Sequence, residues 1–261
     1  MIREKLKEGK TSLGGWIQLA NTDIAEMMGD AGFDWVVVDM EHSSTSHQSL
    51  PDLFRAISLN GTRPYCRIRL PEADLAVQAL EAGAEGIIIP NVEDAYMLRE
   101  IKHKMTYPPT GLRGVGFNRA NGYGKYFSNY LMLKPVIVPM IENVTAIPEL
   151  GHICNEGVDA VMIGPYDLSA SLGKPGDFES NSFQQAIATI MGLCKKYNTP
   201  LGIHVVEPDK RLLQARIEQG FQFISYSSDV VMLQDQLRSF GDHLHSDVHH
   251  NYTSADKSQT P

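Results

Sequence analysis

The sequence predicts an α/β protein built as a single (β/α)8 TIM barrel. Short β-branched runs alternate with amphipathic stretches of helical length over most of the chain. A glycine recurs where helical stretches give way to strands, and 261 residues suit one barrel of eight such units. An open doubly wound sheet is the competing fold, but no GxGxxG motif follows the first strand.

The expected strands are apolar runs rich in Val and Ile, too apolar for a sheet with one solvated face. They are Gly15–Gln18, Trp35–Val38, Tyr65–Ile68, Gly86–Ile89, Val136–Ile141, Ala160–Ile163, Leu201–His204 and Phe223–Tyr226. The helices expected between them are Thr22–Ala31, Ser46–Leu59, Ala73–Ala82, Val92–Lys104, Val144–Cys154, Ser182–Tyr197, Pro208–Gln219 and Val230–Phe240.

Four of these helices end at a glycine shortly before a strand, where a left-handed C-cap is needed. The residues are Gly32, Gly83, Gly157 and Gly220. The recurrence indicates a repeated β-α unit.

Two segments do not fit this repeat. Met105–Tyr130 is rich in Gly, Pro, Asn and Tyr, and is either a functional loop or holds a short extra strand around Arg113–Gly116. Gly241–Pro261 loses the apolar period and contains four histidines, so we expect a flexible tail, with weak metal binding as the alternative. The domain prediction is therefore a barrel over residues 1–240 and a tail over 241–261.

Composition excludes several classes of function. Lys and Arg number 23 against 31 Asp and Glu, and the formal charge of -8 disfavours nucleic acid and anionic lipid as partners. No segment approaches a membrane span, and Met1–Lys10 lacks the apolar core of a signal peptide. Cys66, Cys154 and Cys194 match neither a disulfide framework nor a metal motif, so we expect buried thiols in a cytoplasmic protein.

Ionisable residues gather where the expected strands end, which is the mouth of a (β/α)8 barrel. The second strand leads into Asp39, Glu41 and His42, the third contains Arg67, the fifth ends at Glu142, and the sixth is followed by Asp167. Taken singly, an Asp here can cap a helix and an Arg can form a structural ion pair. Together, unpaired charges at an apolar rim are costly, which favours a functional site.

This set suits the chemistry of a 2-oxo acid. Carboxylates supply hard oxygen ligands for Mg²⁺ or Mn²⁺ (with Co²⁺ or Zn²⁺ as alternatives), and a 2-oxo acid can chelate such an ion through its keto and carboxylate oxygens. Arg67 can neutralise a developing enolate or hold the carboxylate, and His42, oriented by Asp39, can move the proton. Trp16 and Val205 could line the apolar part of the pocket, or belong to the core.

From about Leu13 to Phe240 the chain resembles the HpcH/HpaI aldolase family. The resemblance is carried by Gly32–His42, Arg67, Glu81–Gly83, Met140–Glu142 and Gly164–Gly173. It implies a metal-dependent class II aldolase with a (β/α)8 barrel, assembled as a hexamer, a trimer of dimers that exchange their last barrel helix.

The resemblance also implies roles for individual residues. Glu142 and Asp167 would be the metal ligands, Arg67 would stabilise the enolate, and His42 with Asp39 would be the acid–base pair. Glu81 would touch the outer water shell of the metal across a subunit interface, although the family commonly has Asp there. The backbone at Gly164 and Pro165 would hold the pyruvate carboxylate, where a simple tight turn is the alternative. Arg69 is expected to be a bystander.

The expected reaction is reversible cleavage of a 4-hydroxy-2-oxo acid to pyruvate and an aldehyde through a metal-bound pyruvate enolate. The resemblance further implies that the loop Pro108–Ala120 shapes the aldehyde end of the pocket. One alternative is another enolate lyase on the same barrel, either a 2-oxo-diacid decarboxylase or a lyase of coenzyme A thioesters. The other is a non-catalytic barrel that binds an oxo acid.

Overall fold

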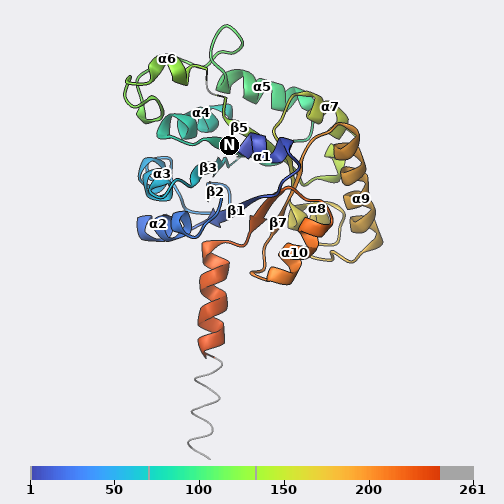
Figure 1. Cartoon of the computed structure of the whole chain (residues 1–261). Coiled ribbons are helices and arrows are strands. Elements are labelled where there is room, and N and C mark those ends of the chain that lie inside the picture. The colour runs from blue at the N-terminus through green and yellow to red at the C-terminus, as the bar shows by residue number, and fades with distance from the viewer. Residues whose placement is uncertain (1, 70, 133, 242–261) are drawn as a thin grey trace, which may run out of the picture.

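A closed barrel of eight parallel strands confirms the predicted fold. The computed structural model describes residues 2–69, 71–132 and 134–241. The strands follow one another in chain order, and the last pairs with the first in parallel, so the sheet has no free edge. Helices surround the strands (Figure 1).

The strands are β1 (Ser12–Ile17), β2 (Trp35–Asp39), β3 (Arg63–Arg67), β4 (Gly86–Ile89), β5 (Val136–Ile141), β6 (Val161–Ile163), β7 (Leu201–Val205) and β8 (Phe223–Tyr226). The α-helices are α1 (Ile2–Lys7), α2 (Thr22–Asp30), α3 (Leu50–Ser58), α4 (Ala73–Ala82), α5 (Ala95–Met105), α6 (Phe127–Tyr130), α7 (Leu150–Asn155), α8 (Pro165–Ser171), α9 (Asn181–Lys196) and α10 (Lys210–Glu218). Short 3-10 turns are η1 (Arg119–Asn121) and η2 (Val144–Ala146), and a further helix covers residues 229–241.

Three strands and one helix have the predicted bounds, and the other strands differ by a few residues at their ends. The four junction glycines adopt the predicted left-handed conformation, with φ between 71° and 113°. Three α-helices, α1, α6 and α8, were not predicted. The charged residues of α1 mask its apolar face, and α6 is a single turn within the long segment 105–130. Pro165, for which a tight turn was the alternative, is the first residue of α8, a position where proline is favoured.

The barrel interior is filled by its own cluster of apolar side chains, separate from the cluster between strands and helices. Ile2 and Leu6 of α1 belong to this interior cluster and close the amino-terminal end of the barrel. Above them Trp35 stacks on Phe223, with ring centroids 4.2 Å apart, and on Tyr65 at 5.4 Å. Because these side chains fill the barrel interior from its amino-terminal end, a functional mouth is left at the carboxyl ends of the strands.

The segment 105–130 contains turns, η1 and α6, and no strand forms at Arg113–Gly116. It connects α5 to β5 and therefore lies on the amino-terminal side of the barrel. Arg119 Nη1 donates a hydrogen bond of 3.1 Å to the carbonyl of Ala82, just before β4. Within one chain this loop lies away from the strand-end mouth that the resemblance assigned to it.

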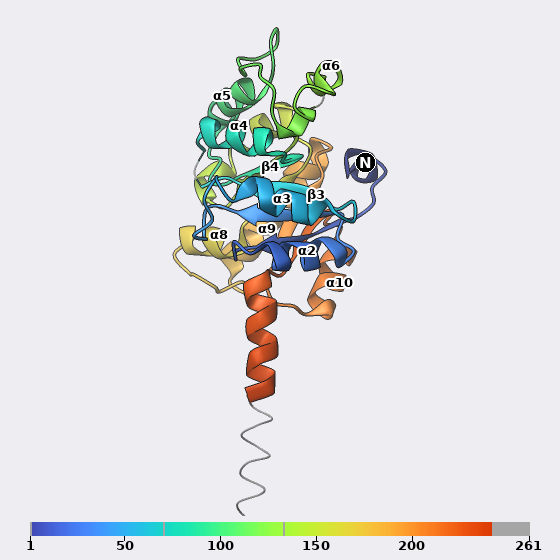
Figure 2. The ribbon, with the colours of Figure 1, turned by 90° about the vertical axis from the view of Figure 1, so that its left-hand side faces the viewer.

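The helix over residues 229–241 projects away from the barrel (Figures 1 and 2). Its base is fixed, because Asp229 accepts hydrogen bonds of 2.9 Å from the backbone N–H groups of Gln18 and Leu19. The predicted tail, apart from residue 241, lies outside the described residues. No helix in the described part of the chain is long and apolar enough to cross a membrane.

Candidate active site

The structure brings Asp39 and Arg67 together at the carboxyl ends of β2 and β3, where they are register partners on neighbouring strands. Arg67 donates from Nε to Asp39 Oδ1 at 2.9 Å and from Nη2 to Oδ2 at 2.7 Å. The Asp39 side chain is fully buried and that of Arg67 is 7% exposed. Although burial opposes ionisation, these bonds lower the pKa of Asp39, so the pair is ionised and rigid.

Glu41 is the second carboxylate on Arg67. Its Oε2 lies 2.9 Å from Arg67 Nη1 in an ion pair that lacks the alignment of a hydrogen bond. Burial, with repulsion from Glu142, Asp39 and Asp167, raises the pKa of Glu41 to about 7, against the attraction of Arg67. All three guanidinium nitrogens of Arg67 therefore contact a carboxylate. The contact with Glu41 is the one that lacks hydrogen-bond geometry.

Glu142 directly follows β5 and is a further buried carboxylate at the mouth, 3% exposed. Its Oε1 accepts a 2.6 Å hydrogen bond from the backbone N–H of Asn91, whereas Oε2 has no hydrogen-bond partner among the described residues. Gly164 lies directly against it, since a Cβ there would be 2.4 Å from Oε2. Burial and repulsion from Asp167 raise the pKa of Glu142 to about 7.

A divalent cation fits this environment. Oε2 of Glu142 is a buried, unsatisfied oxygen, and Asp167 in the first turn of α8 is close enough to raise the pKa of both Glu41 and Glu142. Within the described ranges, no group of three or more His, Cys, Asp or Glu side chains converges on a metal position. Two carboxylates would leave the remaining octahedral positions to water and substrate.

An aromatic wall supports Arg67. The ring centroid of Trp16 in β1 lies 5.0 Å from the guanidinium carbon of Arg67. His204 of β7 stacks on the Trp16 ring, with the two ring centroids 4.8 Å apart. Burial lowers the pKa of His204 to about 4, so its imidazole is neutral at neutral pH. Val205, predicted to line the pocket or to belong to the core, lies in the apolar cluster between strands and helices and is therefore a core residue.

His42 is exposed on the turn after β2. Asp39 Oδ1 accepts from the backbone N–H of His42 at 3.3 Å, so the described contact of Asp39 is with the main chain of His42. Gln18 Nε2 lies 3.3 Å from both Asp39 Oδ2 and the carbonyl of His42. The turn is thus held by Asp39 and Gln18, while the imidazole stays accessible at the mouth.

The structure places the remaining candidates in two regions. Gly164 and Pro165 begin α8 beside Glu142; because proline has no N–H, an anion there must use other donors of this turn. Arg69 is exposed and donates to the carbonyl of Met40, which separates it from Arg67. Glu81 lies near the end of α4, on the amino-terminal side of the barrel, and does not reach Glu142 of its own chain.

Sequence reasoning missed two residues of this site. Glu41 was noted at the strand end without a role, and His204 was expected only as part of a strand. Both are polar residues at the carboxyl end of a barrel strand, and that rule, applied to every strand, would have found them.

Comparison with known proteins agrees with this geometry. The profile of the HpcH/HpaI aldolase/citrate lyase family matches residues 12–235. The chain belongs to the HpcH/HpaI aldolase/citrate lyase family. It is 34% identical over 239 residues to "Hydroxypyruvate/pyruvate aldolase" of Roseobacter denitrificans, covering 89% of this chain and 92% of that relative.

Two further similarities support the assignment. "2-dehydro-3,6-dideoxy-6-sulfogluconate aldolase" of Pseudomonas putida is 33% identical, with 88% of this chain and 91% of the relative covered. The crystal structure of an HpcH/HpaI aldolase/citrate lyase family protein from Burkholderia cenocepacia has a TM-score of 0.86 at 27% identity, covering 94% of this chain and 98% of that one. This HpcH/HpaI protein is an aldolase, a carbon–carbon lyase.

Replacing Asp39 with Ala is expected to lower the free energy of unfolding by about 3–5 kcal/mol, because Arg67 would stay buried without its main partner. Chemical denaturation measures the change. Asp52→Ala, which breaks the exposed pair with Arg55, is the matched control and should cost less than about 1 kcal/mol. Equal effects of the two substitutions would show that the buried pair is not special.

The protonation of Glu142 should appear in the pH dependence of stability when a chelator keeps the protein metal-free. Between about pH 4.5 and pH 7 the unfolded chain ionises this residue while the folded protein keeps it protonated, so the free energy of unfolding falls as pH rises. Relative to wild type, Glu142→Gln should gain about 1–3 kcal/mol between pH 5 and pH 8. Glu179→Gln controls for loss of an exposed carboxylate; a pH-independent Glu142→Gln difference would contradict this.

Proposed function

We propose that this aldolase is metal-dependent and reversibly cleaves a 4-hydroxy-2-oxo acid to pyruvate and an aldehyde. The observation that carries the proposal is the unsatisfied Oε2 of Glu142 at a barrel mouth that also holds the buried Arg67. Such an oxygen suits a cation, and a fixed guanidinium suits the anion that forms when the carbon–carbon bond breaks.

Glu142 and Asp167 would hold the divalent ion, with Mg²⁺ or Mn²⁺ favoured by an all-oxygen donor set and Co²⁺ or Zn²⁺ as alternatives. When bound, the ion polarises the 2-oxo group of the substrate. It would also remove the electrostatic conflict that raises the pKa of Glu142, since both carboxylates would then be ionised against a positive charge.

The other residues would divide the work of cleavage among them. Arg67 would bind the enolate oxygen or the substrate carboxylate, held in place by Asp39 and against the Trp16 ring. His42 would take the proton of the 4-hydroxyl, directly or through a water, and return a proton to the enolate. The turn at Gly164 and Pro165 would receive the substrate carboxylate, because Gly164 has no Cβ and therefore leaves room beside Glu142.

The substrate class follows from this chemistry and agrees with the 2-oxo acids in the names of relatives such as "Hydroxypyruvate/pyruvate aldolase". Cleavage in this site yields a small 2-oxo acid and an aldehyde. The cytoplasm remains the compartment that the sequence predicts.

Exchange of the pyruvate methyl protons tests the enolate step without knowledge of the aldehyde. The protein is incubated with pyruvate and Mn²⁺ or Mg²⁺ in D₂O, and the methyl signal is followed by NMR. We expect metal-dependent exchange that His42→Ala slows by roughly 10²- to 10⁴-fold and that Glu142→Ala abolishes.

His152→Ala is the matched control, because it removes an exposed imidazole outside the site. It should leave the exchange rate unchanged. Exchange that persists in chelator would refute the proposal, and so would a lack of exchange with Mg²⁺, Mn²⁺, Co²⁺ and Zn²⁺ each tested in turn.

We also propose a hexamer, a trimer of dimers, in which the helix over residues 229–241 packs against a partner subunit. Val230, Leu233, Leu237 and Phe240 on this helix are 37–62% exposed and recur at intervals of three and four residues. An apolar stripe on a projecting helix needs a cover, and a second copy supplies one. Glu81 would reach the outer shell of the metal from a neighbouring subunit.

The assembly can be measured by light scattering after size-exclusion chromatography. Wild type should contain six chains, and the double variant Leu233→Asp/Leu237→Asp should contain fewer, because two carboxylates would be buried in the interface. Leu59→Asp, at an exposed leucine that follows α3, is the control. An unchanged particle for the folded double variant would contradict the proposed role of the helix.

A further inference from the structure

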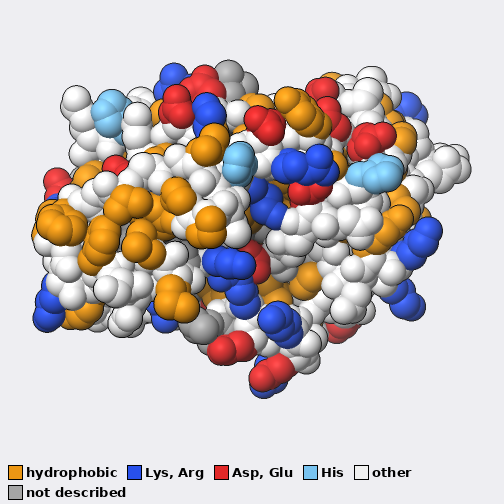
Figure 3. Space-filling model, turned by 90° about the horizontal axis from the view of Figure 1, so that it is seen from above, with side chains coloured by type: hydrophobic (Ala, Val, Ile, Leu, Met, Phe, Trp, Pro, Cys, Tyr) orange, Lys and Arg blue, Asp and Glu red, His pale blue; other side chains and the backbone are white. Residues whose placement is uncertain are grey.

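A cavity of about 740 Å³ lies at the amino-terminal end of the barrel, opposite the active site. The first residues of β3, the segment before β4 and the segment before β5 line it, together with the loop that holds Arg113 and Arg119. Figure 3 shows the adjoining side of the molecule, which carries α4 to α6, with Lys and Arg side chains spread over it and Asp and Glu side chains among them.

Positive charge dominates the lining. It contains five cationic side chains and one carboxylate, that of Glu85; the cations are Arg3, Arg63, Arg113, Arg119 and Lys134. Arg63 uses Glu85 in a 2.6 Å ion pair, and Arg3 is paired with Asp159. In the described part of the chain, Arg119 and Lys134 have no ion-pair partner, so the cavity has a net positive charge.

A buried hydroxyl points to the same conclusion. Tyr65 lines this cavity and is 0% exposed, and its hydroxyl has no hydrogen-bond partner among the residues that the structure describes. A buried hydroxyl of this kind normally binds a protein group, a water or a ligand. Tyr65 therefore adds to the lining of this cavity a buried hydroxyl that has no described partner.

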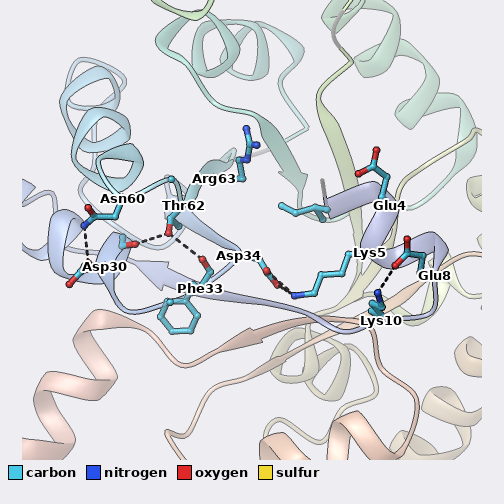
Figure 4. A pocket seen from close by; sticks show the side chains of 14 residues that line it. Glu4, Lys5, Glu8, Lys10, Asp30, Phe33, Asp34, Asn60, Thr62 and Arg63 are labelled. Carbon is cyan, nitrogen blue, oxygen red and sulfur yellow. Dashed lines mark hydrogen bonds and ion pairs between the residues drawn. The ribbon is translucent and has the colours of Figure 1, made fainter.

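A neighbouring cavity shows what the ordinary arrangement looks like in this protein. The cavity of about 650 Å³ in Figure 4 also contains lysines, but Lys5 lies 2.7 Å from Asp34 and Lys10 lies 2.7 Å from Glu8. Both lysines are thus paired with carboxylates of the same lining. Lys5 and Lys10 of that cavity therefore differ from Arg119 and Lys134, for which no ion pair is found among the described residues.

We propose that the cavity lined by Tyr65, Arg119 and Lys134 binds a small molecule through its phosphate group. A phosphate dianion accepts several hydrogen bonds at once, which matches a guanidinium, an ammonium and a phenol hydroxyl. The volume is in the range of small-molecule pockets, so a phosphorylated metabolite fits as well as the free ion. The proposal does not depend on the reaction at the other end of the barrel.

The test is isothermal titration of the full-length protein at low ionic strength, with a chelator present so that no metal at the active site binds the probe. Glucose 6-phosphate and inorganic phosphate are the two probes, and glucose is the uncharged control. We expect saturable binding of glucose 6-phosphate below about 1 mM and none of glucose. Equal affinity for inorganic phosphate would identify the free ion as sufficient.

Two substitutions locate the binding. Lys134→Gln changes an exposed side chain and Tyr65→Phe removes only the hydroxyl; each should weaken binding by about 10-fold, the loss of one contact to a charged group. Lys10→Gln, in the compensated cavity, should change nothing. A lack of saturable binding would overturn the proposal. An affinity in Lys134→Gln and Tyr65→Phe equal to that of wild type would also overturn it, and binding lost only in Arg67→Gln would place the probe at the active site.

Discussion

The bidentate pair between Arg67 and Asp39 is the constraint on which the active site depends. Two opposite charges are placed at the end of an apolar barrel, where the cost of desolvation offsets most of their attraction. Such a pair contributes little to stability compared with well-packed apolar side chains, so its presence is better explained by what it positions. It fixes one guanidinium in a known orientation at the mouth, with Trp16 against its face.

Around that fixed guanidinium the protein places more negative charge than one arginine can neutralise. Burial raises the pKa values of Glu41 and Glu142 to about 7, and repulsion adds to it, from Asp39, Glu142 and Asp167 on Glu41 and from Asp167 on Glu142. A protein with no use for a cation would lower its free energy by replacing one of these carboxylates. The retained conflict is the physical argument for a divalent ion, and it arises from residues at the carboxyl ends of three strands, β2, β5 and β6.

Much of the fold could be predicted from sequence because the strands are short apolar runs whose limits coincide with changes in polarity. Gly86–Ile89 and Val136–Ile141 were predicted with their observed bounds for that reason. The interior role of Ile2 and Leu6 could not be predicted, since two apolar residues among charged ones acquire their meaning only from the open barrel end that they fill.

The candidate site was predictable to a similar depth. Strand ends indicated which residues meet, and the structure brings Asp39, Arg67 and Glu142 together. The sequence could not predict the ion pair between Glu41 and Arg67, because a Glu after a strand is usually solvated. The burial of Glu41 against Arg67 results from the register of β2 with β3. The same holds for His204, whose stacking on Trp16 depends on two strands far apart in the chain.

Strand β3 connects the two ends of the barrel and shows how one chain keeps opposite charges apart. Alternate residues of a strand face the same side, so Arg63, Tyr65 and Arg67 form one inward-facing row from the amino-terminal cavity to the catalytic mouth. The aromatic layer of Trp35, Tyr65 and Phe223 lies between them and excludes water. Because this layer is solid, the excess of carboxylates at one end and the excess of cations at the other cannot neutralise each other. A net charge of -8 thus conceals two local imbalances of opposite sign, and each end is left to attract a ligand of its own.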